Sequence, residues 1–140
     1  MIRPLWVIDT NVLVSAALTP GGVCDYVLDY AVAGSFIPAW NNLMLVEYRD
    51  VLSRPRFKLS PETVDRLLYS LPRSGYVHRV VSELRLPDAD DQPFLSVAMS
   101  TPDKMIVTGN PRHYPAPLMK KHGVTIVSPR QALDRLSLMR

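Results

Sequence analysis

A short apolar run near the start of the chain most strongly constrains the fold. Residues 5–8 read LWVI and are followed directly by Asp9. A continuous apolar run of this length predicts a strand that is buried on both faces. Asp9 ends that strand, and an ionised carboxylate is costly to bury unless it is paired, hydrogen-bonded or bound to a metal. Asp9 therefore needs a partner.

Apolar runs and stretches of helical period alternate along the rest of the chain. The strands are predicted at 5–9, 35–38, 76–81, 104–108 and 124–127. The helices are predicted at 10–33 with a break at 20–22, at 41–52, at 60–71, after the loop 86–90 to about residue 100, and from 128 onward. This alternation indicates an α/β protein with a parallel sheet covered on both faces. In such sheets ligands bind at the carboxyl ends of the strands, where Asp9 and residues 108–110 fall.

The composition restricts the class of protein. A chain of 140 residues, 47% of them hydrophobic, suits a single domain over residues 1–140 with a substantial core. No stretch approaches the roughly 20 apolar residues of a membrane span. The only cysteine, Cys24, cannot form an internal disulfide, which fits a cytoplasmic location. The net charge of +3 permits a polyanionic partner but also fits ordinary surface charge.

Asp91 begins the apolar stripe of a predicted helix. It is followed at i+3, i+4 and i+7 by Phe94, Leu95 and Ala98, so the acid should share the buried face. Asp88 stands three residues earlier, near the same face. Both acids have a simpler interpretation as helix caps, because aspartate is favoured at helix N-termini and Pro93 marks a helix start.

Glu47 lies in the middle of a predicted helix. Leu43, Met44 and Val51 stand at helical spacing from it, which places it within an apolar face. The alternatives for Glu47 are a salt bridge with Arg49 or Arg54, or a place at the edge of the apolar stripe where the carboxylate reaches water. The alternative for Asp9 is helix capping. One divalent cation held by oxygen ligands would explain all three inward-facing acids with a single cause.

Other polar residues near the strand ends have two interpretations each. Thr10, Asn11 and Thr108 suit the positioning of water or phosphate, but also capping and turns. Basic residues occur in three clusters that suit contacts with phosphate or plain solvation. These clusters are Arg54, Arg56 and Lys58; Arg112 with His113; and Lys120, Lys121 and His122.

Four segments taken in order resemble the PIN-domain family, most closely its branch of toxin components of toxin–antitoxin pairs. The segments are VIDTNVLV at 7–14, EYRDVLSRPRF at 47–57, DADDQPFL at 88–95 and VTGN at 107–110. The resemblance implies a three-layer α/β/α sandwich and a Mg²⁺- or Mn²⁺-dependent ribonuclease. It also implies an RNA substrate, a cognate antitoxin protein and a homodimer.

The resemblance also assigns residues. Asp9, Glu47 and Asp91 match the metal-binding, catalytic acids of the family, and Asp88 matches an acid common in this branch. The segments around Thr10, Asn11, Thr108, Asn110 and Arg112 fall where the substrate is expected to bind.

Asn110 departs from the family pattern, since many members carry an acid there. An amide oxygen can bind a cation but adds no charge, so the number of metal ions stays open, and so does a non-catalytic RNA-binding or protein-binding role. A phosphatase with an aspartate nucleophile is a weaker alternative, because Asp9-Thr10-Asn11 lacks the second acid of such a site.

Overall fold

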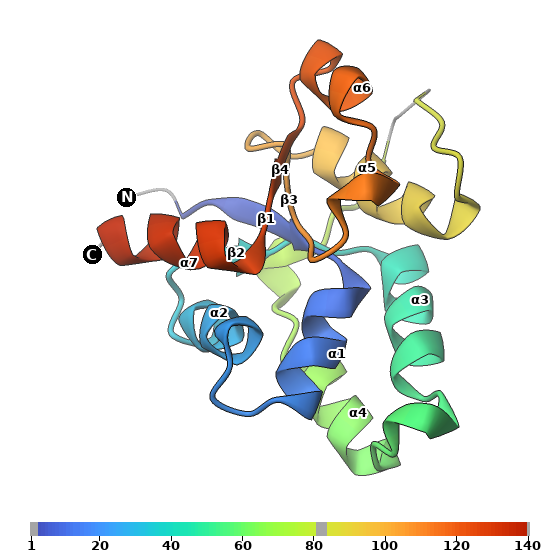
Figure 1. Cartoon of the computed structure of the whole chain (residues 1–140), viewed down its shortest axis with the longest axis vertical. Helices are drawn as coiled ribbons and strands as arrows, with labels where there is room; N and C mark the ends of the chain where they lie inside the picture. Colours follow the sequence, from blue (N-terminus) through green and yellow to red (C-terminus); the bar gives the residue numbers. More distant parts are fainter. Residues whose placement is uncertain (1–2, 81–83, 140) are drawn as a thin grey trace.

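The computed structural model describes residues 3–80 and 84–139. Its centre is a four-stranded sheet in the order β2-β1-β3-β4, in which all pairings are parallel (Figure 1). The strands are β1 (Leu5–Ile8), β2 (Ile37–Pro38), β3 (Met105–Val107) and β4 (Thr125–Val127). Strand β1 lies inside the sheet between β2 and β3. Its neighbour β3 comes from a distant part of the sequence. All strands therefore present their carboxyl ends at one edge.

Helices cover both faces of this sheet. Helix α5 packs against β1 and β3, whereas α7 packs against β4 and α2, and α1 contacts both α2 and α3 (Figure 1). The layers form the α/β/α sandwich that the sequence resemblance implies. The α-helices of the described residues are α1 (Thr10–Leu18), α2 (Val23–Val32), α3 (Asn42–Leu52), α4 (Pro61–Tyr69), α5 (Gln92–Met99), α6 (Ala116–Lys121) and α7 (Pro129–Leu138).

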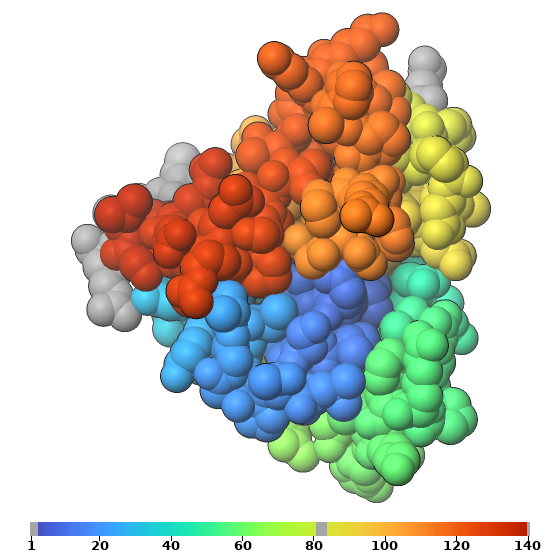
Figure 2. Space-filling view, viewed as in Figure 1, coloured from blue at the N-terminus to red at the C-terminus, as the bar shows by residue number. Residues whose placement is uncertain are grey.

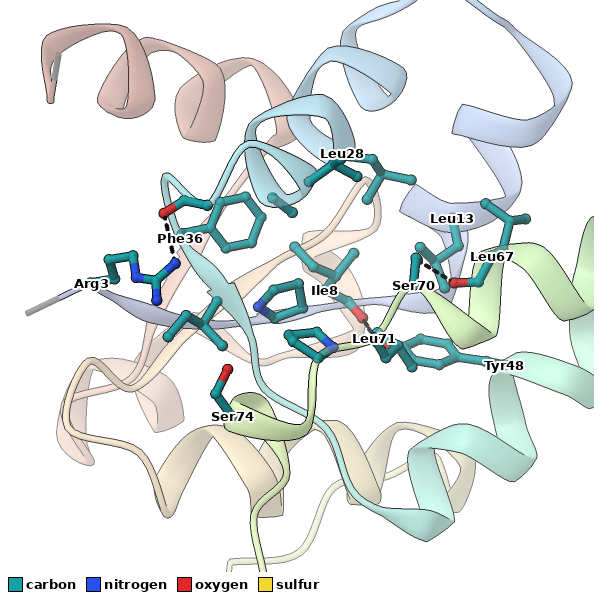
Figure 3. A pocket seen from close by; sticks show the side chains of 16 residues that line it. Arg3, Ile8, Leu13, Leu28, Phe36, Tyr48, Leu67, Ser70, Leu71 and Ser74 are labelled. Carbon is teal, nitrogen blue, oxygen red and sulfur yellow. Dashed lines mark hydrogen bonds between the residues drawn. The ribbon is translucent and has the colours of Figure 1, made fainter.

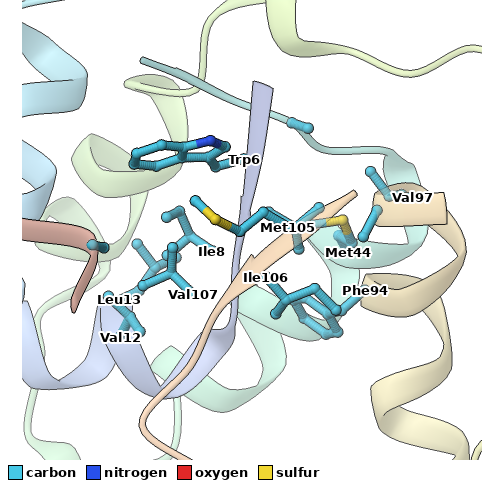
Figure 4. Packing of buried hydrophobic residues seen from close by; sticks show 14 of the residues in the cluster. Trp6, Ile8, Val12, Leu13, Met44, Phe94, Val97, Met105, Ile106 and Val107 are labelled. Carbon is cyan, nitrogen blue, oxygen red and sulfur yellow. The ribbon is translucent and has the colours of Figure 1, made fainter. Parts of the chain in front are cut away.

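The core surrounds the two central strands. Val7, Ile106 and Val107 have no exposed surface, and Ile8 has 2%. Figure 4 shows these strands with Trp6, Met44, Phe94 and Met105 packed around them. Burial on both faces explains why β1 and β3 consist of continuous apolar runs, as predicted for strands of a covered parallel sheet.

Local signals set most helix ends. The side chains of Asn41, Ser60 and Ser128 accept hydrogen bonds from backbone N–H groups in the first turns of α3, α4 and α7. Proline occupies the first turn of α4 and of α7, where its missing N–H costs nothing. These ends match the predicted starts of the helices. No single helix in the described residues is long and apolar enough to span a bilayer; α1 and α2 meet that requirement only together, bent by 106°.

The predicted strand at 76–81 is wrong for residues 76–80, and residue 81 lies outside the described ranges. Only an isolated parallel bridge between Trp40 and Tyr76 forms there. It follows a 3₁₀ turn, Arg73–Gly75, that brings Gly75 against β2. A Cβ on Gly75 would lie 1.9 Å from the Pro38 carbonyl oxygen, so only glycine allows this approach. The contact ties one residue to the sheet edge instead of a whole strand.

Helix α6 was not predicted. No element was predicted between residues 110 and 124. Pro115 stands at the N-cap of this helix and Pro117 in its first turn, where proline is tolerated. Strand β2 is also shorter than the predicted 35–38, because only Ile37 and Pro38 pair with β1.

Candidate metal and nucleic-acid site

Asp9 and Thr108 meet at the carboxyl edge of the sheet. The register pairs Ile8 with Val107, so the next residues of β1 and β3 emerge side by side. The Asp9 backbone N–H donates to the Val107 carbonyl oxygen at 2.9 Å, and the Thr108 N–H donates to the Val127 carbonyl oxygen at 2.9 Å. Both side chains thus start from rigid backbone, as expected of a site at this edge.

The buried Asp9 carboxylate accepts four hydrogen bonds. Its Oδ1 accepts from the Thr10 backbone N–H at 2.8 Å. Its Oδ2 accepts from the Thr108 hydroxyl at 2.8 Å, from Asn11 Nδ2 at 3.2 Å and from the Tyr114 hydroxyl at 3.2 Å. Asp9 is also the N-cap residue of α1, so the capping interpretation describes part of its environment. These donors satisfy the hydrogen-bonding capacity of a carboxyl group on a residue that is only 4% exposed.

Three of these donors position Asp9. Asn11 Oδ1 in turn accepts from the Gly109 N–H at 2.8 Å, which links α1 to the loop after β3. The Thr108 hydroxyl also accepts from the Asn110 N–H at 3.0 Å. Burial and the Asp9 carboxylate raise the pKa of Tyr114, so this phenol stays a proton donor. Asn11 and Thr108 are therefore committed to Asp9, while Thr10 Oγ1 is buried without a hydrogen-bond partner.

Asp91 is buried beside His113. The His113 Nδ1 lies 3.3 Å from Oδ1 and 3.2 Å from Oδ2 of Asp91. Among the described residues, none makes a hydrogen bond of acceptable geometry to Oδ2. Burial raises the pKa of Asp91 to about 6; His113 opposes this rise, and the charges of Asp9 and Asp88 add to it. Asp91 stands at the N-cap of α5 without a capping hydrogen bond from its side chain. A buried carboxylate oxygen without a hydrogen bond is energetically costly, and a bound cation would offset that cost.

Glu47 lies at the edge of the buried face of α3. That face is formed by Met44, Tyr48 and Leu52, whereas Leu43 is 65% exposed, contrary to the prediction that it shares the apolar face. Burial raises the pKa of Glu47, and the nearby charges of Asp90, Asp50 and Asp91 raise it further.

The predicted alternative of a salt bridge to Glu47 is not seen among the described residues. Arg49 pairs with Asp65 at 2.8 Å, and Arg54 pairs with Asp50 at 3.5 Å. Arg54 still lowers the pKa of Glu47 through its charge, but burial and the charges of the neighbouring acids outweigh this effect.

These acids line one cleft of about 370 Å³. Figure 2 shows the yellow segment that carries residues 88–91 adjoining the cyan-green helix α3 on this face. The cleft brings together most of the residues singled out in the sequence. Its polar and aromatic walls consist of Asp9, Thr10, Asn11, Ser15, Glu47, Arg54, Arg56, Phe57, Asp88, Asp90, Asp91, Phe94, Asn110 and His113.

Two predicted site residues lie elsewhere. Thr108 is fully buried beneath Asp9, and Arg112 is exposed outside the cleft, whose wall contains its neighbour His113 instead. The 3₁₀ turn Pro111–His113 explains this difference, because consecutive residues of such a turn point in different directions. Asp88 lies at the rim, where its side chain accepts from the Asp90 N–H at 2.9 Å and so caps the turn Ala89–Asp91.

The structure adds residues that the sequence did not single out for the site. Tyr114 contacts Asp9, and the Tyr48 hydroxyl donates to the Ile8 carbonyl oxygen directly before it. Phe57 and Asp90 line the cleft. Phe57 belonged to a quoted motif, but Tyr114 lies between Pro111 and Pro115 in a segment that carries no signal for burial.

The donor chemistry fits a divalent cation. Carboxylate and amide oxygens are the ligands that Mg²⁺ and similar hard ions prefer. Within the described residues, however, no three acidic, histidine or cysteine side chains already surround one point. Burial is the main cause of the raised pKa values of Glu47 and Asp91, and the charges of neighbouring acids add to it. A cation would draw the carboxylates inward or bind through water.

A second cavity, of about 410 Å³, has different chemistry. It lies between β2, α2 and α4 and is lined mainly by apolar side chains such as Leu28, Phe36 and Leu71 (Figure 3). Its one charged residue, Arg3, donates to the Gly34 carbonyl oxygen at 3.4 Å. Without an acid, this cavity cannot supply the oxygen ligands found in the cleft.

The chain belongs to the PIN-domain family, whose match covers residues 6–112. The matched region contains Asp9, Glu47, Asp88 and Asp91, together with both strands that carry the site. PIN is a nuclease-type fold, its members are generally hydrolases of nucleic acids, and they typically use divalent metal ions. No curated protein matches the chain.

Proposed function

We propose that this protein is a Mg²⁺- or Mn²⁺-dependent endoribonuclease that hydrolyses RNA phosphodiester bonds. One observation carries the proposal: carboxylates from the end of β1, from α3 and from the start of α5 line a single cleft, where one oxygen of Asp91 is buried and its nearest polar contact is His113. Separate capping or salt-bridge roles would not require the acids to converge.

Asp9, Glu47, Asp88 and Asp91 are the residues proposed to hold the metal. When bound, a divalent cation lowers the pKa of a water and offsets negative charge on a phosphate. The side chains of this protein supply the framework. Thr108 and Tyr114 hold the Asp9 carboxylate in place through its Oδ2, which is the orientation that an efficient site must fix in advance.

Cationic side chains of the same cleft are proposed to bind the RNA backbone. Arg54 and Arg56 line it opposite an acidic wall that would otherwise repel a polyanion. Asn110 offers an amide oxygen and an N–H₂ group at the mouth without adding charge. Thr10 and Asn11 begin α1 and line the cleft beside Asp9, where the substrate is proposed to bind.

The test is incubation of the purified protein with end-labelled single-stranded RNA, with Mn²⁺ or Mg²⁺ and with or without a chelator. Cleavage that needs the metal supports the proposal, and the family resemblance leads us to expect 5′-phosphate and 3′-hydroxyl ends. Asp9→Asn and Asp91→Asn should remove cleavage while circular dichroism shows an intact fold.

Other outcomes would replace this proposal. RNA binding without cleavage would identify a non-catalytic RNA-binding domain, for which Asn110 in place of an acid is the supporting observation. Phosphate release from a small ester, with no cleavage of RNA, would indicate the phosphatase alternative.

We also propose that the nuclease is the toxin of a toxin–antitoxin pair and forms a homodimer. The toxin role is supported by the resemblance of the four sequence segments to that branch of the family. The dimer is supported by Leu43 and Val46, which are 65% and 67% exposed on one side of α3. Expression without an antitoxin should slow growth, and Asp9→Asn should relieve it. Light scattering should give twice the monomer mass, and Leu43→Ser with Val46→Ser should return the monomer.

A further inference from the structure

A 3₁₀ turn directly after α3 adds an unusual side-chain pair to the cleft. The turn, Pro55–Phe57, starts with proline and ends at Lys58, whose φ of 54° is left-handed. Few non-glycine residues adopt such a φ without a structural reason. Arg54, Arg56 and Phe57 all line the cleft that contains the acids.

Arg56 and Phe57 are stacked. The guanidinium carbon of Arg56 lies 4.8 Å from the centroid of the Phe57 ring. Phe57 is half-buried and packs against the core, so the ring has a fixed position. Among the described ion pairs, Arg49 is engaged by Asp65 and Arg54 by Asp50, but Arg56 has no acidic partner. Its planar head is held by an aromatic ring instead of a carboxylate.

Phe57 is the more accessible of the two phenylalanines in the cleft. Phe94 is 1% exposed and packs edge-to-face with Tyr48, at 5.6 Å between ring centroids, so it belongs to the core. The pair of Arg56 and Phe57 therefore offers a flat, cationic surface at the wall of an otherwise acidic cleft. Flat cationic surfaces of this kind suit an unpaired nucleobase, which can stack on aromatic rings and guanidinium planes.

We propose that Arg56 and Phe57 form a nucleobase subsite that stacks one base of the RNA next to the scissile phosphate. This inference rests on the proposed nuclease function and deepens it. By fixing one base, the subsite sets which phosphodiester bond reaches the acids. Bases within a duplex face one another and cannot reach the subsite, so a paired nucleotide at that position is excluded.

The experiment uses end-labelled single-stranded RNA with one preferred cut and a set of derivatives, each with one abasic nucleotide near that cut. For the wild type we expect kcat/KM to fall about tenfold for one abasic position only, the size typical of losing one stacked base. Phe57→Leu keeps an apolar side chain and Arg56→Lys keeps the charge, and both remove the stack. Each should lower kcat/KM on intact RNA about tenfold, spread the cut over neighbouring bonds and abolish sensitivity to the abasic position.

Arg66→Lys is the matched control, because Arg66 is exposed on α4 and lies outside the cleft. It should change neither rate nor cut position. Thermal unfolding checks the fold of each variant. If Phe57→Leu is unstable, Arg56→Lys still tests the subsite, because Arg56 is exposed and its replacement should not disturb the core. Two results would overturn the subsite. One is a folded Arg56→Lys variant that cleaves at the same single bond as the wild type, and the other is an equal fall in kcat/KM for every abasic position.

Binding of the same RNAs in chelator, followed by fluorescence anisotropy, separates this inference from the nuclease proposal. Base-dependent binding that Arg56→Lys weakens about tenfold, without cleavage in metal, would support the subsite and overturn the nuclease. Metal-dependent cleavage with the same rate on intact and abasic RNA would support the nuclease and overturn the subsite. Absence of both binding and cleavage would overturn both.

Discussion

The Tyr114 hydroxyl donates a hydrogen bond of 3.2 Å to Oδ2 of Asp9, although 105 residues separate the two in sequence. The bond joins the end of the central strand β1 to the segment between β3 and α6. The same oxygen accepts from Thr108 and Asn11, so its position is set by three side chains. Contacts within the fold therefore position the Asp9 side chain without a bound ligand.

Tyr114→Phe should therefore weaken both fold and site. Removing a donor from a buried carboxylate costs about 1.5–3 kcal/mol, because hydrogen bonds to charged groups lie at the strong end of the range. Urea unfolding should show this loss in the free energy of unfolding. Tyr69→Phe is the control, since Tyr69 is 83% exposed and should change stability little. A stability of Tyr114→Phe equal to the wild type would mean that the bond contributes nothing.

Asp91→Asn should stabilise the metal-free protein while it removes cleavage. The pKa of Asp91 is raised from its usual 3.8 to about 6, so the folded state disfavours the charged form. Below about pH 4 the acid is protonated in both states and costs nothing. As pH rises from about 4 to 6, the unfolded chain loses its proton first, and the folded state becomes progressively less stable.

The measurement is the midpoint of thermal unfolding in chelator at several pH values. The asparagine variant should exceed the wild type by a few degrees at pH 7.5, with a difference that shrinks toward pH 4. Asp134→Asn, on the exposed side of α7, serves as control. A variant less stable than the wild type at pH 7.5 would contradict the raised pKa.

The affinity for the metal should rise with pH over the range in which the metal-free protein loses stability. A cation needs ionised carboxylates, so protonation of Asp91 near pH 6 competes with it. Titration calorimetry with Mn²⁺ should show affinity falling by up to about tenfold per pH unit as pH drops below 6. Asp91→Asn should bind weakly at every pH tested. An affinity that stays constant from pH 7.5 to 5 would argue against Asp91 as a ligand.

Asn110→Asp should strengthen metal binding. Asn110 lines the cleft with the four proposed ligands but contributes no charge. An added carboxylate should raise the affinity for Mn²⁺ about tenfold and increase the stoichiometry, because charge count tunes such sites. Asn42→Asp, at the exposed start of α3, is the control. Unchanged affinity and stoichiometry would show that residue 110 does not reach the ion.

The elements predicted best were those with strong local causes. The apolar run of β1 fixed a central strand because both of its faces are buried, and prolines with serine caps located α4 and α7. The segment 76–80 was wrongly predicted to be a strand. Only Tyr76 forms a backbone bridge, and that bridge is isolated. Backbone pairing depends on neighbours that a single segment does not reveal.

The candidate site shows the same division. The positions of Asp9 and Asp91 followed from a strand end and a helical stripe, and both lie in one cleft. Tyr114 could not be foreseen, because its role comes from a contact between distant segments. Leu43 was wrongly predicted to share the buried face of α3. The buried side chains are Met44, Tyr48 and Leu52, and Leu43 lies beside that face.

The central position of β1 has a consequence for synthesis on the ribosome. Its second neighbour, β3, contains Met105–Val107, and the hydroxyls that hold Asp9 come from residues 108 and 114. A nascent chain shorter than this exposes one side of β1 and leaves Asp9 without two of its donors. The assembled cleft thus appears only after residue 114 has been synthesised, so products that terminate before it lack two donors to Asp9.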